Sequence, residues 1–218
     1  MCIRDRYTTG NVSLVARPAD NVRLSVGPSF LRDVDPRGFV ANVTDPAAVR
    51  FSGVRSVFAK VEQRTFGMTT RIDATFSPTL TLEMFAQPFI AEGRFDRYNE
   101  YAAPRTTDAR YYGQDGSSII QTRDSSGHVT HHRIDPDGDG PARAFTLANP
   151  DFNLRSLRGT AVVRWEYRPG STLFVVWTQQ RSGGQALGGF DLDADRRALF
   201  SDRPVNVFQV KASYWVGR

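Results

Sequence analysis

The sequence has no long apolar run. Hydrophobic residues make up 40% of its 218 residues and the mean hydropathy is −0.40, while a transmembrane helix requires roughly 18–20 continuous apolar residues. These values exclude a helical membrane protein. They do not exclude a membrane β-barrel, whose strands alternate lipid-facing with lumen-facing side chains and so have an unremarkable average hydropathy.

The sequence also has no cluster of basic residues. Its net charge is +5, from 28 basic and 23 acidic side chains, but these charges are scattered and Arg far outnumbers Lys. Nucleic-acid binding typically requires a basic patch or stripe, so we expect no nucleic-acid partner. The single cysteine, Cys2, excludes an internal disulfide and any multi-cysteine metal site.

The first six residues, Met1 to Arg6, lack the apolar core and the small-residue cleavage site of a signal peptide. We treat residues 1–6 as a leader foreign to the fold, and residues 7–218 as one β-domain of a longer protein.

What the sequence does have is period-2 alternation in segments of about ten residues, which is typical of tilted membrane strands. Nine such segments are expected, at 12–17, 22–30, 39–43, 57–64, 68–76, 80–90, 157–167, 173–180 and 208–216. The pattern predicts an all-β fold, an antiparallel up-and-down transmembrane β-barrel segment with long extracellular loops. Bacterial barrels have even strand numbers, so nine strands would form an incomplete barrel.

The links between these segments differ in length. Tight links at 18–21, 77–79 and 168–171 alternate with long ones, above all an irregular insertion at 92–152 and a stretch at 184–204. Short periplasmic turns and long extracellular loops are the outer-membrane pattern. Aromatic residues also gather near strand ends, where an interfacial girdle would lie: Phe76, Trp165, Tyr167, Tyr214 and Trp215.

The polar faces of the segments mix both charge signs, as in a wet lumen. The lumen-lining candidates are Arg23, Lys60, Glu62, Arg71, Asp73, Glu83, Arg158, Arg164, Glu166 and Lys211. Half-buried strands of a soluble β-sandwich alternate in the same way. A soluble ligand-binding sandwich therefore remains the alternative, and a cell-surface hydrolase is the third hypothesis.

Three stretches carry a resemblance to a known family: FSPTLTLEMFAQPFIAEG from Phe76, NPDFNLRSLRGTAVVRWEYRPGSTLFVVWTQ from Asn149, and NVFQVKASYWVG from Asn206. Together they resemble the C-terminal barrel region of a family of large bacterial outer-membrane proteins of unknown function. In that family the barrel typically follows a module similar to family 9 carbohydrate-binding domains. The resemblance implies an outer-membrane location, with lipid, the barrel-assembly machinery and carbohydrate as partners, and it implies no catalytic residues. The chain departs from the pattern in ending on Arg218 and not on an aromatic residue.

Two clusters could bind metal. Asp135, Asp137 and Asp139 surround glycines as in the first half of a calcium loop, but Thr146 stands where a bidentate Glu would be needed. A polar surface turn is the other interpretation, and no cofactor is expected unless this turn binds calcium. His128, His131 and His132 could contribute to a zinc site, although adjacent histidines in a strand point to opposite faces.

Catalytic patterns are few. No Gly-x-Ser-x-Gly elbow occurs, and Glu62, Glu83 and Glu166 each have a basic neighbour in the same segment, which favours a neutralised lumen over glycoside chemistry. We therefore expect a barrel segment that is not an enzyme and that serves carbohydrate-related binding or uptake at the cell surface.

Overall fold

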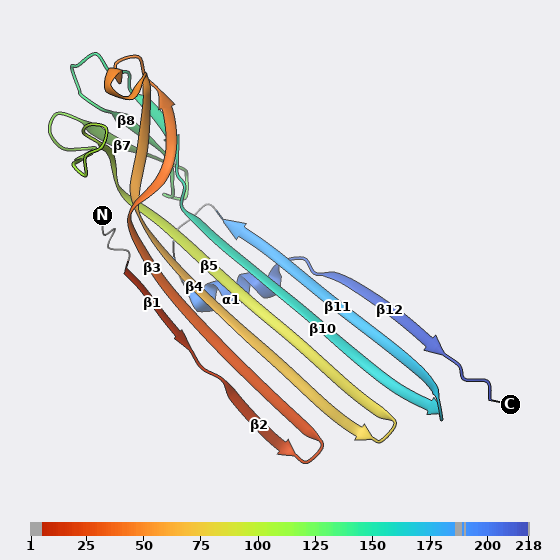
Figure 1. Ribbon diagram of the computed structural model, residues 1–218. Helices are drawn as coiled ribbons and strands as arrows, with labels where there is room; N and C mark the ends of the chain where they lie inside the picture. The colour runs from red at the N-terminus through yellow and green to blue at the C-terminus, as the bar shows by residue number, and fades with distance from the viewer. Residues whose placement is uncertain (1–5, 186–188, 190, 218) are drawn as a thin grey trace.

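The computed structural model describes residues 6–185, 189 and 191–217, and its fold is all-β with antiparallel sheets (Figure 1). The strands are β1 (Arg6–Asn11), β2 (Leu14–Ala19), β3 (Val22–Thr44), β4 (Val54–Ser77), β5 (Leu80–Tyr101), β6 (Ala109–Tyr111), β7 (Ser118–Arg123), β8 (Val129–Asp135), β9 (Phe145–Ala148), β10 (Phe152–Arg168), β11 (Ser171–Gln185) and β12 (Val205–Ser213). A 3₁₀ turn, η1 (Val49–Phe51), and one helix, α1 (Leu192–Ser201), complete the elements. Arg6, expected in the leader, is the first residue of β1 and pairs with Val34, whereas residues 1–5 lie outside the described part.

Most strands belong to one large sheet with the order β1-β3-β4-β5-β10-β11-β12. β2 pairs with the first residues of β3, and β1 pairs with the middle of β3. Both therefore lie along the edge of β3 that faces away from β4. Three two-residue links, at 20–21, 78–79 and 169–170, join neighbouring strands at one end of this sheet, which we call the hairpin end. The longer connections all lie at the opposite, loop end (Figure 1). The predicted alternation of tight and long links is confirmed.

The strands are longer than predicted. The segments expected at 22–30 and 39–43 are one strand, β3, and those at 57–64 and 68–76 are one strand, β4. β3 and β4 stay paired from Val22↔Ala74 to Thr44↔Val54, with register shifts that absorb irregular residues near Asp35 and Phe39. Treating these as separate strands was wrong. In β3 a bulge between Asp35 and Gly38 interrupts the side-chain alternation without ending the backbone pairing. In β4 the apolar residues change face, because Val57 and Ala59 pack in the core at the loop end whereas Ile72 lies on the opposite side of the sheet.

The large sheet is open. β1 and β2 form one edge and β12 the other, and no pairing among the described residues joins them. Since each neighbouring pair is antiparallel, β2 and β12 run in the same direction, from the loop end to the hairpin end.

The two faces of the sheet differ near the hairpin end. One row of directly paired residues crosses six strands and is apolar throughout, and the next row on the same face is too. The first row is Val22, Ala74, Leu82, Val163, Val175 and Val210, and the second is Leu24, Ile72, Met84, Ala161, Trp177 and Phe208. We call this side the apolar face and the other the polar face.

The region 92–152 is not the irregular loop that we predicted. β5 continues to Tyr101, β6 pairs with its last residues, and β7, β8 and β9 form a separate three-stranded sheet. The 184–204 link likewise contains α1, which the sequence analysis did not predict. No helix within the described residues is long and apolar enough to cross a membrane.

Helix α1 packs against the loop-end half of the apolar face. Asp191 caps it by accepting hydrogen bonds from the N–H groups of Asp193 and Ala194, both at 3.0 Å. The buried Arg155 on β10 pairs with Asp202 at the helix end, with Nε and Oδ2 2.8 Å apart. Gly183 permits this contact, since a Cβ there would lie 2.3 Å from the Asp202 carboxylate. α1 thus neutralises one of the charged side chains on the loop-end half of this face.

Candidate functional site

The loop end has a hydrophobic core of its own. Residues of β4, β5, β8 and β9, together with Tyr112 after β6, bury their side chains against one another. Its members are Val57, Ala59, Tyr98, Tyr112, Ile134 and Leu147, with Val57, Ala59 and Ile134 fully buried. This core fixes the three-stranded sheet to the ends of the long strands, so the polar groups beside it have defined positions.

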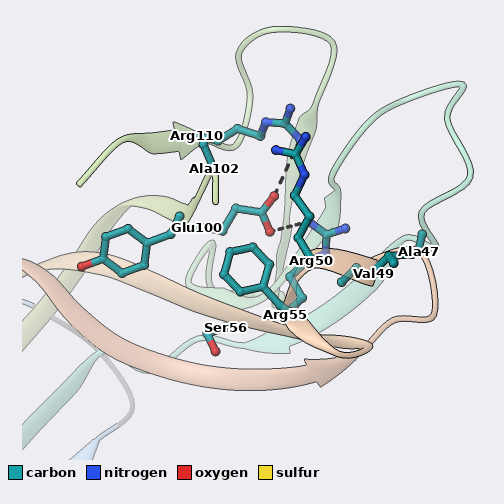
Figure 2. Close-up of a pocket in the computed structure, with 11 residues that line it drawn as sticks. Ala47, Val49, Arg50, Arg55, Ser56, Glu100, Ala102 and Arg110 are labelled. Atoms are coloured by element: carbon teal, nitrogen blue, oxygen red, sulfur yellow. Dashed lines mark hydrogen bonds and ion pairs between the residues drawn. The ribbon is translucent and has the colours of Figure 1, made fainter. Parts of the chain in front are cut away.

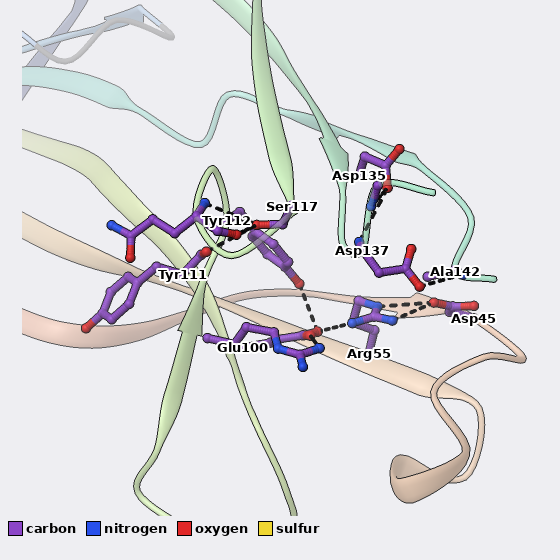
Figure 3. Close-up of polar contacts among 12 residues, drawn as sticks. Asp45, Arg55, Glu100, Tyr111, Tyr112, Ser117, Asp135, Asp137 and Ala142 are labelled. Atoms are coloured by element: carbon purple, nitrogen blue, oxygen red, sulfur yellow. Dashed lines mark hydrogen bonds and ion pairs between the residues drawn. The ribbon is translucent and has the colours of Figure 1, made fainter. Parts of the chain in front are cut away.

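A buried ionic cluster centred on Arg55 adjoins this core (Figure 3). Arg55 is the second residue of β4. It donates a hydrogen bond to Asp45, the residue after β3, with Nη2 and Oδ2 2.8 Å apart. It also donates to Glu100 near the end of β5, and the Tyr112 hydroxyl donates to the same Glu100 oxygen at 3.0 Å. Three chain segments far apart in sequence are therefore tied together by one guanidinium.

The electrostatics of this cluster favour its charged state. Burial alone would raise the pKa of Asp45, but hydrogen bonds from Arg55 and from the Ala47 N–H outweigh it and lower that pKa below 3.8. Burial opposes the charge on Arg55, yet its two carboxylate partners raise its pKa above the ordinary value. Burial and the adjacent Glu100 charge raise the pKa of Tyr112, so its hydroxyl stays a hydrogen-bond donor.

Two pockets open beside these groups. The smaller, of about 350 Å³, lies between η1 and the ends of β5 and β6 (Figure 2). The larger, of about 920 Å³, lies between the end of β5 and the β7–β8 hairpin. Its lining combines aromatic rings with carboxylate, amide and guanidinium groups: Tyr98, Tyr112, His128, His132, Asp96, Asp151, Gln121, Asn149, Arg94, Arg97 and Arg123. Such a mixture suits a ligand that offers both apolar and hydrogen-bonding surface.

The histidines do not assemble a zinc site. His131 is exposed and His132 is buried on β8, as expected for neighbours in a strand, and His128 lies 3.5 Å from Asp124. The His132 ring packs on Tyr98 with centroids 4.7 Å apart. Burial lowers the pKa of His132, so it is neutral at pH 7.

The acidic turn after β8 uses its carboxylates on its own backbone. Asp135 Oδ1 accepts from the Gly138 N–H at 3.0 Å, and Asp137 Oδ2 accepts from the Ala142 N–H at 3.1 Å (Figure 3). Asp139 does not complete a site with them, since no group of three acidic, histidine or cysteine residues in the described part could hold a metal ion. The geometry favours the polar turn over calcium.

The ten lumen-lining candidates divide between the two faces. Eight share the polar face, with Arg158 nearer the loop end and the others nearer the hairpin end: Arg23, Arg71, Asp73, Glu83, Arg158, Arg164, Glu166 and Lys211. Lys60 and Glu62 lie on the opposite side, because β4 pairs without a register shift from Lys60 to Thr75 and even-numbered residues there share the face of Ile72. Glu62 instead binds Arg64 and Arg32, at 2.8 and 2.9 Å. The glutamates weighed for glycoside chemistry therefore do not converge.

Sequence reasoning missed Asp45, Arg55, Glu100 and Tyr112. They lie at strand ends that had been assigned to loops, and their pairing depends on contacts between residues 10 and 45 positions apart. Comparisons with family models, with characterised proteins and with solved structures found no match.

Proposed function

We propose that this chain forms part of the wall of an antiparallel β-barrel in a bacterial outer membrane. The observation that carries this proposal is the apolar face, where two successive rows across six strands contain no polar side chain. The intervening row on the opposite face is mixed and mostly polar: Arg23, Asp73, Glu83, Val162, Val176 and Gln209. A soluble protein rarely leaves so wide an apolar surface uncovered, whereas a barrel wall needs lipid-facing and lumen-facing rows in alternation.

The hairpin end supports the same proposal. Phe76, Trp165, Tyr167, Tyr214 and Trp215 gather there and all are exposed, which suits an interfacial girdle. The short links at that end would then be periplasmic, and the loop end with its core, its ionic cluster and its pockets would face outward.

The role that we propose for the loop end is ligand binding, in a carbohydrate-related setting as the family resemblance implies. The larger pocket supports it, because its rings and planar polar side chains match the mixed surface of a sugar. The soluble β-sandwich alternative would require a second layer over the apolar face. In the described residues only α1 provides one, and only toward the loop end.

Tryptophan quenching by brominated lipids tests the barrel. Trp177 lies in an apolar row, and Trp165 lies four residues nearer the hairpin end by strand pairing, about 14 Å along the strand. Two variants of the full chain would each keep one of these tryptophans, the others being changed to Phe, and would be refolded into lipid bilayers.

The expected result is that Trp177 is quenched most by bromine placed deep in the acyl chains and Trp165 by bromine near the headgroup. Equal or absent quenching of both, with the chain folded and monomeric in aqueous buffer, would overturn the barrel and favour the soluble module.

A further inference from the structure

The smaller pocket has an unusual balance of charge. Arg50, Arg55 and Arg110 line it together with one acidic residue, Glu100 (Figure 2). Much of the remaining wall is small or apolar, with Ala47, Ala48, Val49 and Ala102. Three guanidinium groups thus border a space of about 350 Å³ that holds a single carboxylate.

The three cations are not equally engaged. Arg55 is buried and fully occupied by Asp45 and Glu100. Arg110 is half exposed and reaches Glu100 only at 4.0 Å, the limit of an ion pair. Arg50 is exposed and has no hydrogen-bond or ion-pair partner within the part of the chain that the structure describes. Two guanidinium forks are therefore available to a ligand in the pocket.

The backbone that carries Arg50 is firmly held. The Asp45 N–H donates to Gly53 O at 2.9 Å and the Gly53 N–H donates to Ala48 O at 3.1 Å, which closes the loop around η1. Ser52 and Gly53 adopt positive φ values of 55° and 78° to make this closure. A non-glycine residue such as Ser52 keeps that conformation only where its surroundings impose it. Arg50 is thus presented on a fixed loop opposite Arg110.

We propose that this pocket binds a phosphate group, with Arg50 and Arg110 as its ligands and the Arg55–Glu100 pair as the scaffold that positions them. The planar guanidinium matches phosphate oxygens in a two-bond fork. Arg50, Arg55 and Arg110 outnumber the carboxylates of Asp45 and Glu100 by one, so the pocket keeps a net positive charge that favours an anion. The phosphate could belong to a soluble molecule or to a lipid headgroup. This proposal does not depend on the barrel, because the pocket lies in the loop end with its own core.

Calorimetric titration of the full chain with inorganic phosphate tests it, in a phosphate-free maltoside detergent at low ionic strength and pH 7.5. We expect saturable binding with a dissociation constant in the ~millimolar range. Arg50→Gln and Arg110→Gln should each weaken binding about tenfold or more, and Arg50→Lys should weaken it less, because Lys retains the charge and loses the fork.

Arg133→Gln is the matched control. Arg133 is exposed on β8, does not line the pocket and carries the same charge, so its loss should change affinity less than twofold. Circular dichroism of each variant would confirm that the sheet is intact. Absence of phosphate binding by the folded wild-type chain, or equal weakening in the Arg133 variant, would overturn the proposal.

A second titration identifies the source of the phosphate. Phosphatidylcholine vesicles with and without phosphatidic acid would be added to wild-type chain and to Arg50→Gln. Phosphatidic-acid binding that is tighter than that of free phosphate and depends on Arg50 supports a lipid headgroup. Binding of inorganic phosphate alone supports a soluble ligand.

Discussion

The hairpin-end half and the loop-end half of this molecule are stabilised differently. In the hairpin half the strands pair side by side, and large apolar side chains such as Phe208 and Val210 are about 70% exposed. In the loop-end half a second sheet covers the strands, and Ile134 and Val57 are completely buried. The loop end therefore has a covered core like that of a small two-layer domain, while no covering layer lies over the hairpin half within the described residues. The two halves should respond to different mutations.

The largest effect is expected from Arg55→Met. Removing the guanidinium leaves Asp45 and Glu100 buried and uncompensated, which costs about 3–5 kcal/mol when a buried pair is broken. Hydrogen exchange measured by mass spectrometry should show faster exchange in β6 to β9 and unchanged exchange in β10 and β11. If protection from exchange fell equally in both halves, the loop end and the hairpin half would unfold together, which would contradict their separate stabilisation.

Val163→Arg should act on the other half. Val163 lies in a fully apolar row, and an arginine at the middle of a lipid-facing strand costs about 2–4 kcal/mol. Refolding yield into bilayers should fall, while exchange at the loop end stays unchanged. Arg164→Ala is the control, since Arg164 follows Val163 in sequence but lies on the polar face, and its loss should be mild. Equal yields for both variants would contradict a lipid-facing row.

Acidification should weaken the loop end before the hairpin half. The folded-state pKa of His132 is lowered by burial from 6.5, so the unfolded state binds the proton more readily and stability falls as the pH drops below about 6.5. The limiting slope for one proton is about 1.4 kcal/mol per pH unit. Urea unfolding at pH 7.5 and 5.5 would measure this loss. His132→Phe should abolish it, and an unchanged loss in that variant would assign it elsewhere.

The smallest effect is expected from Asp135→Ala. Its carboxylate accepts from the N–H of Gly138 in an exposed turn, so its loss should cost about 0.5–1.5 kcal/mol, as for one net hydrogen bond. Calcium addition should leave the melting temperature of the wild-type chain unchanged. A calcium-dependent rise that Asp135→Ala removes would restore the metal-binding interpretation of this turn.

The sequence predicted the hairpin half well because one face there is apolar and the other polar, which produces alternation. It failed in the part of β5 after about residue 90 for the same physical reason. Ala91, Glu92 and Gly93 are consecutive and all buried, as are Tyr98, Asn99 and Glu100. Where both faces of a strand are covered, period 2 disappears, so β5 appeared to end early and the ionic cluster was not predicted.

The sequence carries a start signal for helix α1 that the prediction did not use. Asp191 is the N-cap, and Asp193 and Asp195 lie in the first turn. Acidic residues in the first turn stabilise a helix, because their negative charge interacts favourably with the positive end of the helix dipole. The docking of α1 on Arg155 depends on a contact 47 residues apart, which local pattern cannot reveal.

The parallel courses of β2 and β12 limit what can complete this sheet. Seven strand positions lie between and including its two edges, and the edge strands point the same way, so they cannot join each other by antiparallel pairing. A second copy paired through β12 in antiparallel fashion would carry its loop end on the opposite side. To close this sheet into an antiparallel barrel, an odd number of further strands must therefore lie between β12 and β2. The total number of strands would then be even, as it is in bacterial outer-membrane barrels.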